Sequence, residues 1–390
     1  MKLFFRIALR ILYRFRAFNT DVLTTPGPVL LIPNHTSWID WLFLWCVLDD
    51  DWKFVTSSVT AQTTWLHRAI MMNRYTFPID TSSPYAVKRM AEFLMAGGRL
   101  VLFAEGRLSL TGNIMKLFDG TGFLLFKTRA KVITAYLRGA KRLPLSPNKE
   151  KKLLFPKVTV HFSKVQGAPE LHHVSTTHSR QILTSWLRDR LLDQQFQTEM
   201  EIGPKNLLAA VSEMARLQPS KIILEDALRQ QLSYRRLLTG AELLGKVVSR
   251  VAAPHENRIG VLLPNINALP VLLFGLWHTG RTPAILNFST GTATMLACAQ
   301  LAGFRLVVTS RSFVVRAKLD LEPLQRVGIQ FVFLEDLRTQ ISRGEKVLAL
   351  LKQYFSPGLH NPALDSDQPA VVLFTSGSEG VPKGVELSHK

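Results

Sequence analysis

Short, fully apolar runs recur along the 390-residue chain, and several end directly at a turn of polar residues or glycine. Such a run, bounded by turn residues, predicts a β-strand buried on both faces. Helix-like segments separate the runs, and this alternation predicts an α/β fold with a mostly parallel sheet. We expect strands at 29–32, 100–103, 132–137, 158–162, 222–225, 259–263, 306–309, 331–334 and 370–374, and helices at 41–48, 84–95, 206–217, 233–250 and 268–277.

The chain is long enough for two domains, and its composition changes near residues 195–205. We predict a first domain over residues 15–200 and a second over residues 201–390. A hydrophobic fraction of 47% excludes a disordered protein. Cys46 and Cys298 are too few and too far apart for a disulfide framework or a metal site, so we expect no metal bound by the chain itself and a reducing cytosolic environment.

The formal net charge of +19 indicates an anionic partner. Lys2, Arg6, Arg10 and Arg14 recur every four residues, with apolar residues between them. This spacing predicts a basic amphipathic helix over residues 1–18, which we expect to lie in the plane of an anionic membrane surface. The alternative is a basic first helix packed on the domain. No zinc-finger or RNA-binding aromatic pattern is present, so nucleic acid is not an expected partner.

Residues 259–280 carry no charge over 22 positions, a length that could span a bilayer. Pro264, Asn265, Asn267 and Pro270 interrupt the run. These residues favour a buried strand, a turn and then an apolar helix, with a membrane-spanning segment as the alternative.

The segment Asn34–Asp40 pairs a histidine with a carboxylate five residues later. Histidine has a pKa suited to general-base chemistry, and a carboxylate can orient its ring. Five residues of a helix turn through about 500°, so His35 and Asp40 would not share a helix face. They can meet only if His35 precedes the helix, and Pro33 and Asn34 place a break there.

Two further turns add charged residues suited to a phosphate-bearing substrate. Arg74 stands in an otherwise uncharged run, and the segment Glu105-Gly106-Arg107 follows a predicted strand. Arginine suits phosphate because its planar guanidinium can bind two oxygens.

These elements, in this order, resemble the glycerolipid acyltransferase family over roughly residues 15–140. The resemblance implies that His35 removes the proton of a glycerol hydroxyl, which attacks an acyl thioester. It also implies that Arg74, Glu105, Gly106 and Arg107 shape the acceptor phosphate site. The chain departs from the family pattern at Ala104 and Thr134, where proline is usual.

A second motif follows the predicted strand at 370–374. Its glycines free backbone amides for an anion, its hydroxyls can donate to phosphate oxygens, and its lysine adds a positive charge. It is not a Walker loop, which needs Gly-Lys-Ser/Thr at the start of a helix. The candidate ATP-phosphate residues are Thr375, Ser376, Gly377, Ser378, Glu379, Gly380, Lys383 and Gly384.

This loop resembles that of the adenylate-forming superfamily of acyl ligases, and the resemblance covers about residues 206–390. It implies ATP and Mg²⁺ as cofactors of this half. The superfamily's later Tyr-Gly-x-Thr-Glu segment, hinge aspartate and catalytic lysine do not follow in the sequence. We therefore expect an incomplete adenylate-forming domain, unable to form an acyl adenylate with these residues alone.

The tandem resembles the bacterial bifunctional family that joins a lysophospholipid acyltransferase to an acyl-[acyl-carrier-protein] ligase. It implies that acyl carrier protein delivers an acyl group to the 1-position of 2-acyl-glycerophosphoethanolamine, without a cofactor for the transfer itself. It also implies attachment to the cytoplasmic face of the inner membrane. The alternatives are a stand-alone acyltransferase, an acyl ligase tethered by its first domain, and a non-catalytic lipid-binding protein.

Overall fold

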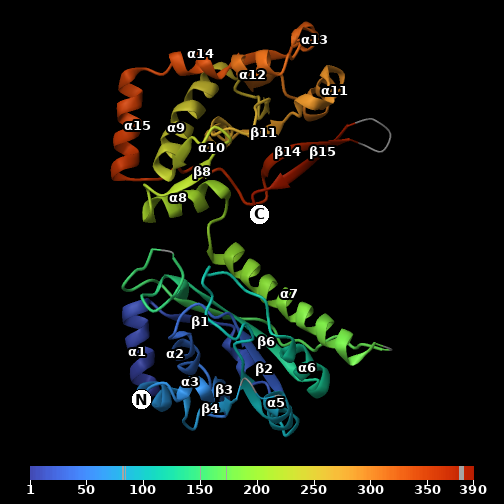
Figure 1. Cartoon of the computed structure of the whole chain (residues 1–390). Helices are drawn as coiled ribbons and strands as arrows, with labels where there is room; N and C mark the ends of the chain where they lie inside the picture. Colours follow the sequence, from blue (N-terminus) through green and yellow to red (C-terminus); the bar gives the residue numbers. More distant parts are fainter. Residues whose placement is uncertain (81–82, 84, 150, 173, 377–381) are drawn as a thin grey trace. The chain divides into compact units, whose positions relative to one another are not determined.

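The computed structural model describes the chain except residues 81–82, 84, 150, 173 and 377–381. It falls into two compact units, Met1–Ile202 and Gly203–Lys390 (Figure 1). Each contains a mostly parallel sheet with helices on both faces, which confirms the predicted α/β class.

Unit 1 contains a seven-stranded sheet of order β1-β7-β6-β2-β5-β3-β4. Only β6 and β7 pair antiparallel in this sheet as described. Its strands are β1 (Arg16–Phe18), β2 (Val29–Pro33), β3 (Trp52–Ser57), β4 (Thr76–Ile79), β5 (Arg99–Val101), β6 (Lys131–Arg138) and β7 (Thr159–Phe162). Its helices are α1 (Lys2–Tyr13), α2 (Asp40–Trp45), α3 (Ser58–Ala61), α4 (Trp65–Met71), α5 (Tyr85–Met95), α6 (Asp119–Thr128) and α7 (Thr176–Ile202).

The central strand β2 shows why this sheet is covered on both faces. Val29 and Leu31 belong to one core cluster, with residues of α1 and α2, while Leu30 and Ile32 belong to the other, with residues of α5, α6 and α7. Side chains alternate between the faces of a strand, so an uninterrupted apolar run needs helices on both sides. Figure 1 shows α1 and α2 on one side of the sheet and α6 and α7 on the other.

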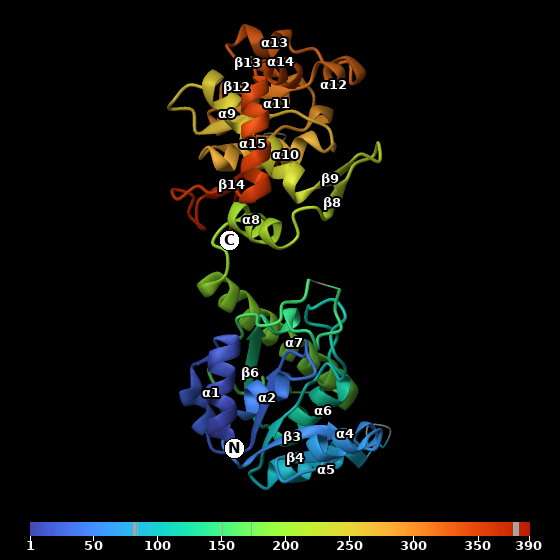
Figure 2. The ribbon, with the colours of Figure 1, turned by 90° about the vertical axis from the view of Figure 1, so that its left-hand side faces the viewer.

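Helix α1 packs on unit 1 through part of its basic stripe. The alternative prediction for residues 1–18 was a basic first helix packed on the domain. Lys2 Nζ donates to Leu48 O at 2.9 Å, and the Arg6 guanidinium donates to Cys46 O. Leu9 is buried in the core. A separate set of apolar side chains on α1 is exposed to solvent: Leu3, Phe4, Ile7, Ile11 and Leu12. Figure 2 views the molecule from the side on which α1 lies.

Unit 2 contains a six-stranded sheet of order β13-β12-β10-β11-β14-β15 and a hairpin of β8 and β9. The sheet is parallel except for β14 and β15. The strands are β8 (Ile222–Glu225), β9 (Gln231–Ser233), β10 (Arg258–Val261), β11 (Thr282–Ile285), β12 (Leu306–Thr309), β13 (Gln330–Phe333), β14 (Pro369–Ser376) and β15 (Pro382–Ser388). The helices are α8 (Leu207–Leu217), α9 (Tyr234–Val251), α10 (Ala268–His278), α11 (Thr292–Ala302), α12 (Arg311–Arg316), α13 (Glu322–Arg326), α14 (Leu334–Thr339) and α15 (Arg343–Phe355).

The uncharged segment 259–280 forms strand β10, a turn and helix α10, which confirms the predicted strand, turn and helix. Helix α10 has 11 residues, and its Leu272 and Leu276 pack in the core against α9 and β10. Among the helices of the described residues, none is long and apolar enough to cross a bilayer.

Candidate functional site

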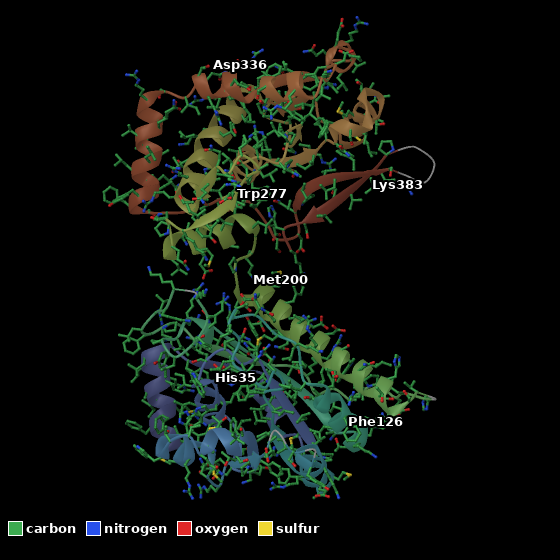
Figure 3. The ribbon with its side chains drawn as sticks, viewed as in Figure 1. His35, Phe126, Met200, Trp277, Asp336 and Lys383 are labelled. Atoms are coloured by element: carbon green, nitrogen blue, oxygen red, sulfur yellow. The ribbon has the colours of Figure 1, made fainter. Side chains whose placement is uncertain are left out.

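The turn after β2 carries His35 at the carboxyl edge of the unit 1 sheet (Figure 3). Asn34 holds this turn to β6, because its side-chain oxygen accepts from Leu137 N at 2.7 Å and its side-chain nitrogen donates to Leu137 O at 3.4 Å. Both bonds are buried. The break predicted at Pro33 and Asn34 is therefore fixed to the neighbouring strand.

His35 and Asp40 meet as the spacing argument required. His35 Nδ1 lies 3.1 Å from Asp40 Oδ2, and Asp40 is the first residue of α2. The same Asp40 oxygen accepts from the backbone N–H groups of Thr36, at 2.6 Å, and Ser37, at 2.8 Å. Asp40 is fully buried. An ionised carboxylate only accepts, so Nδ1 carries the ring proton and Nε2 is left free as a base.

The His35 ring is fixed from a second direction by Phe103. The two rings stack with centroids 4.1 Å apart and an interplanar angle of 30°. Phe103 follows β5, the strand next to β2. The apolar run 100–103 predicted Phe103 only as the end of a strand, although an aromatic residue so close to Glu105 could have indicated a contact with the site.

Glu105 acts on the backbone around His35. Its Oε1 accepts from His35 N at 3.0 Å, and its Oε2 accepts from Met115 N at 2.9 Å. Burial raises the pKa of Glu105, and the backbone donors of Met115 and His35 oppose that rise. Both oxygens of Glu105 thus accept from backbone amides, and one of these bonds holds the His35 turn in place.

Gly106 and Arg107 follow Glu105 at the same edge of the sheet. Gly106 has φ 64°, a backbone conformation that favours glycine. A Cβ placed there would also displace the exposed Phe118 ring. Arg107 is exposed. It is therefore available to an anionic group that approaches the His35 edge.

Arg74 lies at the opposite edge of the sheet from His35, which corrects the expected cluster of acceptor-site residues. It precedes β4, which runs parallel to β3, and β3 runs parallel to β5. The amino end of β4 therefore faces away from the carboxyl end of β2. Arg74 pairs there with Asp50 at 3.3 Å and with the Tyr75 hydroxyl. At the His35 edge, β4 instead delivers Ile79 and Asp80.

Exposed apolar side chains surround the His35 turn. Trp38 N donates to Leu145 O, and the Trp38 ring contacts His67 at 5.9 Å between centroids. His67 lies on α4, which follows β3 along the chain, and the apolar residues lie on α4 or in the connections that follow β2, β5 and β6. The exposed members of this apolar rim are Trp38, Trp65, Leu110, Phe118 and Leu145.

The second motif lies on the hairpin of β14 and β15. Thr375 is paired with Lys383 and Phe374 with Gly384, so hydroxyl and ammonium groups stand near the hairpin end. Figure 3 marks Lys383 at the start of β15. Gly377, Ser378, Glu379 and Gly380 lie outside the described residues.

The described part of this hairpin fits a phosphate group. Thr375, Ser376 and Lys383 are exposed at the carboxyl end of β14, the edge at which parallel α/β sheets bind ligands. Among the described residues, no group of three or more His, Cys, Asp or Glu could hold a metal ion. A magnesium ion bound with a nucleotide takes much of its coordination from phosphates and water.

Comparison with known protein families identifies both halves. Residues 14–138 match the Acyltransferase family, and residues 211–390 match the AMP-binding enzyme family. A match to the second family implies the use of ATP with Mg²⁺ in this half.

Individual relatives match less than half of the chain. A 4-hydroxybenzoate–CoA/benzoate–CoA ligase of Rhodopseudomonas palustris is 30% identical over 41% of this chain and 29% of its own length. A hybrid PKS-NRPS synthetase of Acremonium is 24% identical over 47% of this chain and 4% of its own length. The chain thus spans less than a third of these curated relatives.

Among solved structures, an O-succinylbenzoate coenzyme A synthetase of Bacillus subtilis in complex with AMP matches 46% of this chain and 41% of its own, with 17% identity and a TM-score of 0.37. The Acyltransferase match lies within unit 1, and the AMP-binding match lies within unit 2. The chain joins an N-terminal acyltransferase domain to residues of an AMP-binding domain, the layout of a bifunctional acyltransferase and acyl ligase.

Proposed function

We propose that unit 1 transfers a fatty acyl group from acyl carrier protein to the 1-position hydroxyl of a 2-acyl lysophospholipid. The proposed acceptor is 2-acyl-glycerophosphoethanolamine, and the product is phosphatidylethanolamine. The observation that carries the proposal is the His35–Asp40 pair at a sheet edge rimmed by exposed apolar side chains. An apolar rim suits substrates with acyl chains.

The proposed reaction uses His35 in both of its proton transfers. Nε2 accepts the proton of the glycerol hydroxyl, and the resulting oxygen attacks the thioester carbonyl. The C–O bond forms, the C–S bond breaks, and the imidazolium returns the proton to the departing thiolate. Asp40 stabilises the imidazolium formed between the two transfers, because its oxygen already accepts from Nδ1.

Charge supports the proposed partner and the acceptor. The first half of the chain is basic, and acyl carrier protein is acidic, so the two surfaces attract each other. Arg107 is exposed near His35 and can pair with the acceptor phosphate. Arg74 has no part in this proposal because it lies at the other edge of the sheet.

We also propose that α1 attaches unit 1 to the cytoplasmic face of the inner membrane. Its exposed side chains Leu3, Phe4, Ile7 and Ile11 supply the apolar contact. Acyl activation with ATP is proposed for the whole enzyme, in which the hairpin at Thr375 and Lys383 would hold the nucleotide phosphates.

The test is acyl transfer from acyl-acyl carrier protein to 2-acyl lysophosphatidylethanolamine in the absence of ATP. We expect transfer by the wild-type chain and a loss of at least about 10²-fold for His35→Ala, the usual contribution of a general base. His178→Ala, on α7, is the matched histidine control. Equal rates for wild type and His35→Ala would contradict the proposal.

The same assay separates the alternatives. An acyl ligase tethered by unit 1 would show no transfer by unit 1, and His35→Ala would leave ligation by a longer form unchanged. A lipid-binding protein would bind the lysophospholipid with no turnover in either variant. A stand-alone acyltransferase would accept acyl thioesters from another source and ignore the identity of the carrier.

A further inference from the structure

We propose that a pocket beside α1 binds the phosphate of an anionic phospholipid headgroup. The pocket has a volume of about 680 Å³ and is lined by four arginines, Arg6, Arg10, Arg14 and Arg16. Among the described residues that line it there is no carboxylate, and Phe18 and Val47 contribute apolar surface. This volume lies within the range of ordinary small-ligand sites.

Local structure explains why the four arginines gather. Arg6, Arg10 and Arg14 are spaced four residues apart, so they follow one face of α1. Arg14 ends the helix with φ 48°, and the chain then turns directly into β1. That turn brings Arg16, the first residue of β1, to the same pocket.

The positive charge of this pocket is incompletely matched within the protein. Arg6 donates to Cys46 O, and Arg14 donates to Phe155 O at 3.3 Å. Arg10 and Arg16 are exposed and have no ion pair in the described part of the chain. Like charges four residues apart destabilise a helix, so a bound anion would relieve a repulsion that the sequence builds in.

The neighbouring surface favours a lipid over a protein as the source of the anion. The same helix exposes Leu3, Phe4, Ile7 and Ile11, which a bilayer can bury. A helix that lies in the membrane plane places its arginine guanidinium groups at the level of the lipid phosphates. Apolar burial and phosphate binding would therefore act at one interface.

This site is separate from the His35 turn. Strand β1 is the terminal strand of the sheet, and β7 and β6 lie between it and β2. Three inter-strand spacings amount to roughly 14 Å. The inference rests on the proposed attachment of α1 to a bilayer, but it does not depend on acyl transfer.

The first experiment measures flotation of the full chain with vesicles of phosphatidylethanolamine alone and of equimolar phosphatidylethanolamine and phosphatidylglycerol. We expect the anionic vesicles to bind the wild type more tightly. Arg10→Gln/Arg16→Gln should weaken that binding roughly 30-fold, or about five-fold for each interfacial charge removed. Lys88→Gln/Lys131→Gln removes two exposed charges elsewhere on unit 1 and should change binding less than about two-fold.

A second variant separates a pocket from diffuse positive charge. Thr20 lines the pocket and is exposed, so Thr20→Trp adds bulk there while it keeps all four arginines. We expect Thr20→Trp to weaken binding to anionic vesicles and to leave binding to neutral vesicles unchanged. If Arg10→Gln/Arg16→Gln weakened vesicle binding and Thr20→Trp did not, the pocket proposal would be overturned. The arginines would then attract anionic lipids without a defined site.

Competition identifies the source of the anion. Dihexanoyl-phosphatidylglycerol, below its micelle concentration, should displace the protein from vesicles more effectively than inorganic phosphate. Equal competition would overturn the lipid assignment in favour of a free phosphate. Equal binding of wild type to both vesicles would overturn the headgroup site but not the attachment of α1. If Arg10→Gln/Arg16→Gln reduced binding of acyl carrier protein and not of vesicles, the occupant would be a protein, and the proposal would fail.

Discussion

The His35 turn of unit 1 and the Lys383 hairpin of unit 2 occupy equivalent places, each at the carboxyl end of a strand in a parallel sheet. They differ in how their side chains are held. Asp40 and Glu105 are buried, and each accepts hydrogen bonds from backbone amides. Thr375 and Lys383 are exposed, and the structure gives their side chains no hydrogen bond to the described residues.

The difference indicates two ways to build a site. Buried bonds fix the His35 turn before substrate arrives, so little ordering remains to be done in the reaction. Exposed side chains without hydrogen bonds lose rotamer freedom when they bind a ligand, and this cost reduces affinity. Unit 1 should therefore act by itself, whereas phosphate binding by unit 2 should respond only weakly to the loss of one side chain.

Asp40→Asn should give the largest effect in this comparison. The asparagine oxygen can occupy the position of Oδ2 and still accept from Thr36 N, Ser37 N and His35 Nδ1, but the side chain carries no negative charge. Nε2 would remain the base, but the imidazolium formed in the reaction would lose the charge that stabilises it. We expect kcat to fall by about 10²- to 10⁴-fold with little change in melting temperature. Asp50→Asn, at an exposed carboxylate, is the control, and a fully active Asp40→Asn enzyme would refute the stabilising role of the Asp40 charge.

Glu105→Gln should have the next largest effect. Glutamine offers only one acceptor oxygen, so either His35 N or Met115 N would face a donor, and we expect kcat to fall roughly 10- to 100-fold. KM for the acyl donor should change little, since Glu105 contacts backbone and not substrate in this arrangement. An increase in KM alone would instead indicate direct binding of substrate.

The pH profile of wild type should contain a contribution from Glu105. Burial raises its pKa, so it takes up a proton at higher pH than an ordinary glutamate, and the protonated group cannot accept from both amides. The rate should therefore decline as pH falls through this raised pKa. Glu105→Gln should lose that component, and an unchanged acid limb would contradict the assignment.

Arg107→Ala and Arg74→Ala form a matched pair at opposite edges of one sheet. Arg107→Ala should raise KM for the lysophospholipid about tenfold, the usual cost of one charged contact, whereas Arg74→Ala should change it less than about two-fold. The measurement is KM for 2-acyl lysophosphatidylethanolamine at saturating acyl donor. Equal losses would mean that substrate reaches both edges.

Sequence patterns predicted the parts of the fold that depend on local residues. Apolar runs predicted β2, β6 and β12, and the break at Asn34 predicted that His35 would reach Asp40. Arg74 was expected beside Glu105 and Arg107, but it lies at the other edge of the sheet. The uncharged run around it does not show whether the strand begins before or after Arg74. The hydrogen bonds from Lys2 and Arg6 to the backbone near α2 could not be predicted. Helical spacing shows that these residues share a face of α1, but not which part of the protein contacts that face.

The long helix α7 was missed for a related physical reason. Leu183, Leu187 and Leu191 form a narrow buried stripe, and the rest of the 27-residue helix is largely polar. A narrow stripe is a weak periodic signal within a long polar segment. The role of Glu105 toward backbone amides was also beyond sequence, because backbone donors leave no trace in residue identity.

Lys383→Ala should give the smallest effect, and it tests whether acyl transfer at the His35 turn is independent of unit 2. Acyl transfer without ATP should stay within about two-fold of wild type, because the side chain belongs to the other unit. Binding of ATP, followed by equilibrium dialysis, should weaken only about five-fold, the loss of one exposed charge. If Lys383→Ala instead lowered ATP-free transfer as strongly as Asp40→Asn, the His35 turn would depend on unit 2, and self-sufficiency of the buried site would be refuted.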